Sequence, residues 1–162
     1  MAPVPQALGV ALALARAPSL AQSVRRRRLP HDILMLIRIA GGCQETCQQA
    51  AQTTGETPTY IRDAAISYLM QILLYPGADS YRVMGVQQNA PQEMLREHMR
   101  WLMLWLHPDR NSSWDSVFTQ RVLRAWEDLK TPERRGDYDL SIRPSELEWP
   151  ARPDLASPGH KG

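Results

Sequence analysis

The sequence is short of the residues that define several common classes of protein. Only two of its 162 residues are cysteine, which is too few for a disulfide scaffold of this size. Cys43 and Cys47 lie four positions apart, on one face of a helix, and no further ligands stand beside them to complete a metal site. We interpret them as small core residues in a reducing compartment, and we predict no metal ion and no cofactor.

Long apolar runs are also missing. A membrane span needs about 18 apolar residues, and the apolar run at 7–14 is much shorter. The arginines follow this run, whereas a secretory signal carries its positive charges in front. We therefore predict no membrane span and a cytoplasmic location. A mitochondrial transit peptide stays an alternative, because residues 1–31 contain five arginines and no acidic residue.

Signatures of enzymes are absent as well. The sequence has no glycine-rich phosphate loop, no His-Glu-x-x-His pattern, and nothing that positions serine, histidine and aspartate as a triad. We predict that the protein is not an enzyme. The net charge of +2 does not require nucleic acid as a partner. The run Arg25–Arg28 could bind nucleic acid or anionic lipid, although we favour a solvated spacer.

What the sequence does contain is helical periodicity without any alternating strand pattern, so the predicted fold class is all-α. Residues 1–31 are rich in alanine, proline and leucine, and we expect a basic segment that is disordered or at most weakly helical. For residues 32–77 the pattern predicts a small helical block. Residues 78–142 predict a helical hairpin with two short flanking helices, and residues 143–162, with four prolines, an irregular tail.

Helix signals within the block at 32–77 come from capping residues. Asp32 is a candidate N-cap for a first helix, which ends at Gly41-Gly42. Thr57-Pro58 combines an N-cap with proline at the first helical position, and so predicts the start of a later helix.

Two longer helices in residues 78–142 each carry one apolar stripe. The first opens at Pro91 and must end at Leu106, since the residue before Pro108 is pushed out of the helical region. Two such helices joined by a loop predict an antiparallel hairpin. The two stripes consist of Leu95, Met99, Leu102 and Leu106, and of Trp114, Phe118, Val122, Ala125 and Leu129.

A second apolar strip lies beside the stripe of the first hairpin helix and includes Trp101 and Trp105. A two-helix hairpin does not need so wide an apolar arc, so something must cover these tryptophans. The protein's own helices at 32–75 are the cover that we favour, and a partner protein is the alternative.

The tip of the hairpin reads Leu106-His107-Pro108-Asp109-Arg110-Asn111, and this segment with its surroundings resembles the J-domain of the DnaJ-like co-chaperones. The resemblance extends from Asp79 to Leu140. Besides the tip, it rests on Tyr81-Arg82-Val83-Met84-Gly85-Val86, on Ala90-Pro91-Gln92-Glu93, on Phe118, Val122, Ala125-Trp126 and Leu129, on Thr131-Pro132-Glu133-Arg134-Arg135, and on Asp137-Tyr138-Asp139.

The resemblance implies a four-helix J-domain that stimulates ATP hydrolysis by a DnaK-class chaperone and so assists folding or the handling of an unidentified client. Proline fixes the turn, histidine can donate or accept a hydrogen bond, and the carboxylate of Asp109 suits an arginine of the partner. Tyr81, Leu106 and Phe118 would support the motif. The implied chaperone-binding residues are His107, Pro108, Asp109, Arg110, Asn111, Arg96 and Arg100.

The first hairpin helix departs from the J-domain pattern in its charge. In the family this helix is usually strongly basic, but here Glu93 and Glu97 balance Arg96 and Arg100. Trp101 and Trp105 also stand where lysine or arginine is common. The alternative function is therefore a J-like interaction or scaffold module that does not stimulate an ATPase and uses these tryptophans as its partner face.

Overall fold

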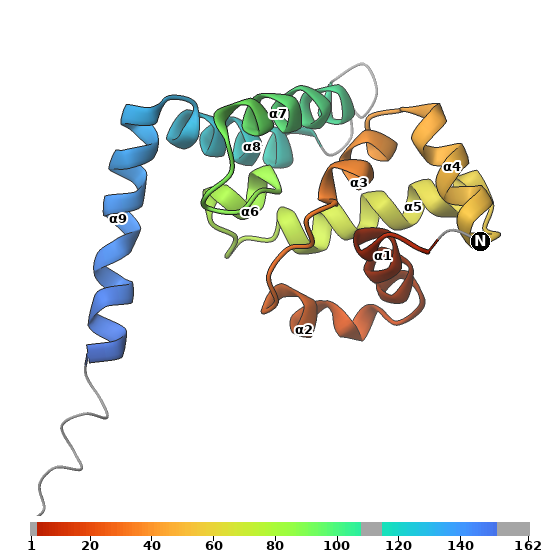
Figure 1. The fold of residues 1–162 in the computed structure, drawn as a ribbon, viewed down its shortest axis with the longest axis horizontal. Helices are drawn as coiled ribbons and strands as arrows, with labels where there is room; N and C mark the ends of the chain where they lie inside the picture. The colour runs from red at the N-terminus through yellow and green to blue at the C-terminus, as the bar shows by residue number, and fades with distance from the viewer. Residues whose placement is uncertain (1–2, 108–114, 152–162) are drawn as a thin grey trace, which may run out of the picture.

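The computed structural model describes residues 3–107 and 115–151, and all regular structure in these ranges is helical, which confirms the predicted all-α fold class (Figure 1). The elements in chain order are α1 (Gln6–Arg16), the 3-10 turn η1 (Pro18–Leu20), α2 (Ala21–Arg25), α3 (Ile33–Ala40), α4 (Gln44–Thr54), α5 (Pro58–Tyr68), the π-helical turn η2 (Leu69–Leu73), α6 (Ser80–Met84), α7 (Gln92–Leu106), α8 (Asp115–Leu129) and α9 (Pro132–Ala151).

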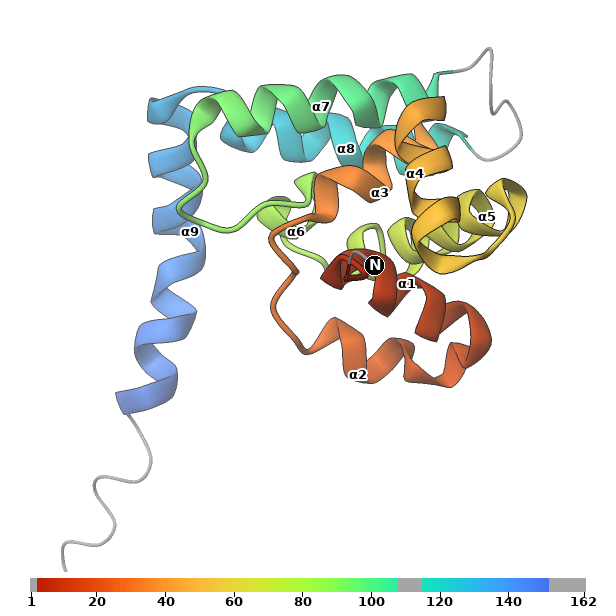
Figure 2. The same ribbon diagram turned by 45° about the vertical axis from the view of Figure 1, so that its right-hand side comes forward.

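Helix α5 is the centre of the N-terminal helices. α1, α3 and α4 all pack against it, with α1 below and α3 above it in the views of Figures 1 and 2. Its side chains Ile61, Ala65 and Tyr68 are buried, as the helical spacing predicts. The predicted caps are confirmed here: the Thr57 side chain accepts a hydrogen bond from the Tyr60 amide at 3.1 Å.

Residues 3–31 are ordered and largely helical, whereas we expected a segment that is disordered or at most weakly helical. Helix α1 packs on α3 and α5 and buries five side chains, namely Ala7, Leu8, Ala11, Leu12 and Leu14. The Asp32 carboxylate flanks α3 as predicted, but it caps α1 instead, accepting a hydrogen bond from the Ala7 amide at 3.0 Å. The segment is ordered because its apolar face is covered by a helix some fifty residues further along the chain, which composition alone cannot reveal.

Helices α7 and α8 lie side by side as the predicted antiparallel hairpin (Figures 1 and 2). Leu95, Leu102 and Leu106 of α7 are fully buried, and Met99 packs against them. On α8, Val122, Ala125 and Leu129 are buried, and Phe118 is half-buried against the same core. The two predicted stripes are thus confirmed, except that Trp114 lies outside the described residues.

Helix α9 is longer than the predicted short fourth helix. It begins as expected, with the Thr131 side chain accepting a hydrogen bond from the Arg134 amide at 3.1 Å. It then continues to Ala151, so the first part of the tail predicted to be irregular is helical. A proline such as Pro144 costs a helix one backbone hydrogen bond, and here the helix runs past it. Residues 152–162 lie outside the described part of the chain.

The N-terminal and C-terminal helices share one core. α3 packs on α7, and η2 contacts α6. The turn after α6 needs Gly85, whose φ is +75°, and a Cβ added there would lie 3.1 to 3.2 Å from side chains of Ile33, Ile37 and Leu73. Side chains from both parts of the chain therefore belong to one hydrophobic core. Within residues 3–107 and 115–151, no helix has the length and apolar character that crossing a membrane requires.

Candidate functional site

The exposed end of α7 carries the first residue of the His-Pro-Asp motif. α7 ends at the fully buried Leu106, and His107 is exposed in an extended conformation, with φ −61° and ψ 136°. The following proline dictates this conformation, because its ring clashes with a helical residue before it. The predicted contact residues Pro108, Asp109, Arg110 and Asn111 lie outside the described residues, so their role stays a prediction.

Both predicted basic contacts on α7 are exposed. Arg96 and Arg100 stand four residues apart and therefore on one face of the helix. Arg100 lies about 10 Å along the helix axis from His107, from the rise of an α-helix over seven residues. The structure thus presents these two cations and His107 along one helix, while Glu93 at the start of α7 is also exposed.

Helix α3 crosses α7 next to these cations. A guanidinium nitrogen of Arg38 lies 2.6 Å from a carboxylate oxygen of Glu97, and its central carbon lies 5.9 Å from the centre of the Trp101 ring. Just beyond α3, Gly41 leaves no space for a side chain, since an added Cβ would lie 2.9 Å from the Trp101 ring and 3.1 Å from its carbonyl oxygen. Sequence reasoning missed this contact because 59 positions separate Arg38 from Glu97.

The two tryptophans of α7 do not form the partner face considered from the sequence. Trp105 has no exposed surface, so the partner-face hypothesis is wrong for this residue. Trp101 is half-buried against the core. Cover by the protein's own fold, which we favoured, explains the wide apolar arc of α7, because α3 packs on this helix as well as α8.

A network of polar side chains joins α6, α7 and α9 at the other end of the hairpin. The hydroxyl of Tyr81 donates to Asp139 at 2.5 Å and accepts a hydrogen bond from Arg135 at 3.2 Å. Burial, aided by the bond to Asp139, raises the pKa of Tyr81 to about 12. Arg135 also donates to the side chain of Gln92 at 2.6 Å, which ties α9 to the start of α7. Tyr81 therefore joins α6 to α9, and its predicted role in supporting the motif stays a prediction.

His98 faces inward from α7. Its Nδ1 lies 2.9 Å from the carbonyl oxygen of Met84, and its side chain is almost fully buried. Burial lowers the pKa of His98, and the hydrogen bond to Met84 opposes this in part. The neutral imidazole with Nδ1–H donating to the carbonyl fits this surrounding, so His98 is a structural residue.

The cysteines are half-buried rather than core residues. The Cys43 thiol lies 3.2 Å from the hydroxyl of Thr46 at the start of α4, and this contact lowers the pKa of Cys43. Cys47 packs against the edge of the core, and burial raises its pKa. In the described ranges, no three His, Cys, Asp or Glu side chains gather closely enough to hold a metal ion.

The run Arg25–Arg28, for which we favoured a solvated spacer, comprises the last residue of α2 and the loop that follows it, and hydrogen bonds hold its backbone and Arg25 in place. Arg25 donates to the carbonyl oxygen of Gln71 at 2.8 Å, and Arg82 of α6 donates to that of Arg27 at 2.6 Å. The side chains of Arg26, Arg27 and Arg28 are exposed.

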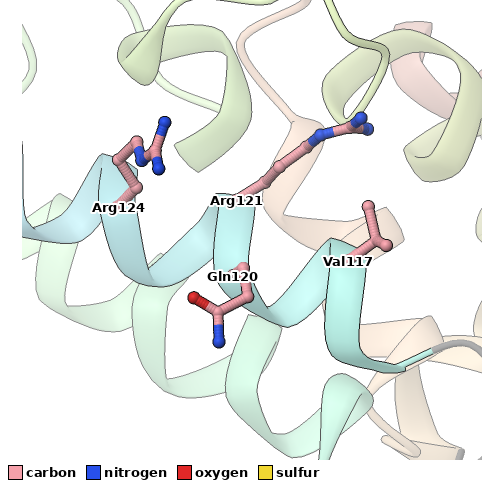
Figure 3. A pocket seen from close by; sticks show the side chains of 4 residues that line it. All are labelled: Val117, Gln120, Arg121 and Arg124. Atoms are coloured by element: carbon pink, nitrogen blue, oxygen red, sulfur yellow. The ribbon is translucent and has the colours of Figure 1, made fainter.

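A groove of about 330 Å³ runs along one face of α8 and is lined by Val117, Gln120, Arg121 and Arg124 (Figure 3). Figure 3 shows Arg121 reaching away from α8, and it donates a hydrogen bond to the carbonyl oxygen of Leu74. This arginine therefore links the hairpin to the N-terminal helices. The described lining of the groove consists of two guanidinium groups, one amide and one apolar side chain.

Comparison with known proteins identifies the C-terminal segment. Residues 79–139 match the DnaJ domain. The protein named "Chaperone protein DnaJ" of Roseiflexus sp. (strain RS-1) is 39% identical over 62 residues, which cover 38% of this chain and 17% of that protein. Those of Rhizobium meliloti (strain 1021) and Thermosipho melanesiensis (strain DSM 12029 / CIP 104789 / BI429) are each 36% identical, over 63 and 64 residues, with the same two shares.

This chain matches only 17% of the length of those relatives. No solved structure matches the chain. The residues that match are those of α6, α7, α8 and the first turns of α9, together with the loops between them. Residues 79–139 of this chain are accordingly a J-domain of the kind found in DnaJ chaperone proteins.

Proposed function

We propose that this protein is a co-chaperone that binds a DnaK-class chaperone and stimulates its ATP hydrolysis through His107, Pro108 and Asp109. The observation that carries the proposal is the J-domain at residues 79–139 with His107 exposed at the end of α7. J-domain proteins act as co-chaperones and are not themselves enzymes. A cytoplasmic location and a client protein of unspecified identity belong to the same proposal.

The packing of the hairpin suits this role. Leu102, Leu106 and Val122 are fully buried between helices, so the end of α7 has a fixed position relative to the rest of the protein. A binding loop held by a rigid scaffold loses little conformational entropy when a partner binds. The exposed Arg96 and Arg100 favour a partner with an acidic surface.

The N-terminal helices fit a role in positioning the J-domain. α3 packs directly on α7, and Arg121 of α8 donates a hydrogen bond to the carbonyl oxygen of Leu74, next to η2. We therefore propose that these helices hold the J-domain in place rather than move independently of it. The alternative of a J-like scaffold without ATPase stimulation rested on the balanced charge of α7 and on its two tryptophans, of which Trp105 is not available to a partner.

The test is single-turnover ATP hydrolysis by a DnaK-class chaperone, measured with the full chain and with His107→Gln. We expect the native chain to accelerate hydrolysis and His107→Gln to lose the acceleration by more than about tenfold, the usual scale for losing a residue at the centre of an interface. His31→Gln is the matched control, because His31 is an exposed histidine in the loop before α3. We expect it to stimulate like the native chain.

Two results would contradict the proposal. Equal stimulation by His107→Gln and the native chain would show that the motif does not act as proposed. No stimulation by the native chain at saturating concentration would favour the scaffold alternative, in which the J-domain makes a contact of another kind.

A further inference from the structure

On its own, α7 has no net positive charge with which to attract an acidic partner. Two arginines and two glutamates between Gln92 and Leu106 sum to zero charge. Arg96, Arg100 and His107 are nevertheless exposed on this helix, so a partner that docks there must offer acidic groups. An unpaired carboxylate at Glu97, between the two arginines in sequence, would repel such a partner.

Arg38 of α3 compensates for this carboxylate. Its ion pair with Glu97 is 2.6 Å long, and both side chains are partly exposed, at 39% for Arg38 and 37% for Glu97. The pair therefore lies at the surface, where a docking partner senses its charge. Adding Arg38 to the two arginines and two glutamates of α7 changes the local net charge from zero to +1.

The same arginine also restores positive charge beside Trp101. The guanidinium groups of Arg38 and Arg100 each lie 5.9 Å from the Trp101 ring, so cations from two different helices flank one indole. Trp101 stands where J-domains commonly carry lysine or arginine. The cation that α7 lacks at this position is thus supplied from α3.

The position of Arg38 is fixed by the core beneath it. Its chain neighbours Ile37 and Ile39 have 0% and 1% exposed surface. The close approach of Gly41 to the Trp101 ring holds the end of α3 against α7. A charged group held in place before binding contributes more to an interface than one on a freely moving side chain, since less entropy is lost.

We propose that Arg38 belongs to the chaperone-binding surface: it neutralises Glu97 and places a guanidinium beside Trp101, so that the N-terminal helices complete the cationic face of the J-domain. The occupant is an acidic surface of the DnaK-class chaperone, and the inference therefore rests on the proposed function. Arg38 acts partly through Glu97 and is to that extent a positioning residue.

The experiment is the single-turnover ATPase assay with the full chain, titrated to find the concentration that gives half-maximal stimulation. The variants are Arg38→Gln, Glu97→Gln, the double variant, and Arg38→Lys. Arg16→Gln is the matched control, because it breaks another surface ion pair between N-terminal segments, Arg16–Glu56 at 2.8 Å, away from α7. Thermal unfolding of each variant is measured alongside.

We expect Arg38→Gln to raise the half-maximal concentration about fivefold at low salt and less at high salt, as screening predicts. The double variant should return to within about twofold of the native chain, because removing the Glu97 carboxylate removes the repulsion that Arg38 had masked. Arg38→Lys should retain most of the affinity, and Arg16→Gln should change nothing. A merely structural role for Arg38 would instead lower the melting temperature of Arg38→Gln in parallel with its stimulation.

Three outcomes would overturn the inference while leaving the proposed function intact. Arg38→Gln could stimulate like the native chain although His107→Gln is inactive. It could stimulate at lower concentrations, which would mean that the ion pair hides the binding face. It could also lose activity in parallel with its melting temperature and without rescue in the double variant. Failure of the native chain itself to stimulate would instead remove the proposed function, and the inference with it.

Discussion

The N-terminal helices and the J-domain are each stabilised by a different kind of interaction. The N-terminal helices depend on apolar burial, with fully buried side chains such as Leu8, Ile37 and Ile61 packed around α5. The J-domain adds a directional polar network, in which Tyr81, Asp139 and Arg135 join its first and last helices. Apolar packing fixes shape, whereas a hydrogen-bond network fixes the relative orientation of particular groups.

The difference suggests how the two parts share their work. The surface that we propose for the chaperone belongs to the J-domain, where orientation matters most. The N-terminal helices supply bulk, one cation from α3, and a continuous core. Changes on either side of the boundary can test whether the parts depend on each other.

The largest effect should come from Ile37→Ala. Ile37 is fully buried, and its side chain lies close to Gly85 of the J-domain, so the substitution opens a cavity at the junction. We expect a loss of about 2–5 kcal/mol in the free energy of unfolding. Chemical denaturation followed by amide exchange should show both parts unfolding in one transition. Separate transitions, with α8 protected after α3 has opened, would show that the parts are independent.

A smaller loss should follow from Tyr81→Phe. The variant keeps the ring but removes the hydroxyl that bonds to Asp139 and Arg135, which should cost about 1–2 kcal/mol. Tyr60→Phe is the control, because Tyr60 is half-buried and its hydroxyl makes no hydrogen bond with any described residue. We expect that control to remain within about 0.5 kcal/mol of the native chain. Equal stability of both variants would mean that the polar network does not contribute as described.

The smallest effect should be a pH dependence arising from His98. Burial lowers the pKa of His98 below its ordinary value of 6.5, so the unfolded chain takes up a proton at a higher pH than the folded one. The unfolded state therefore binds more protons as the pH falls through 6.5, and the free energy of unfolding should decline below that pH. Denaturation midpoints between pH 7.5 and 5.5 should fall less steeply for His98→Gln. Identical slopes for variant and native chain would contradict this assignment.

The sequence predicts the helical hairpin better than the N-terminal helices, and the reason is physical. The stripes of α7 and α8 were predicted because neighbouring helices form a hairpin whose contacts are local, and Leu95, Leu102 and Val122 are buried as expected. Helix α1 was missed because it packs on α5, far away in the sequence. Its side chains Ala7, Leu8, Ala11 and Leu12 do follow helical spacing, but the composition of the segment is typical of disorder and favoured the other interpretation.

The candidate site shows the same division. The exposure of His107, Arg96 and Arg100 follows from helix geometry and from Pro108, and could be predicted. The ion pair of Arg38 with Glu97 could not, because no local pattern announces a contact across 59 positions. The burial of Trp105 was predicted only as one of two options, since amphipathicity shows that a face needs cover but not what provides it.

The polar network at Tyr81 has a consequence for how a J-domain can be combined with other sequences. The Ser80 amide donates to the hydroxyl of Tyr138 at 2.9 Å, so the chain enters and leaves the domain at one place. Figures 1 and 2 show the start of α9 beside the N-terminal end of α7, and His107 follows the other end of that helix. A module whose ends meet can be inserted between unrelated segments like a cassette. In this protein, by contrast, the segment before α6 is not such an interchangeable part, because α3 packs on α7 and shares its core.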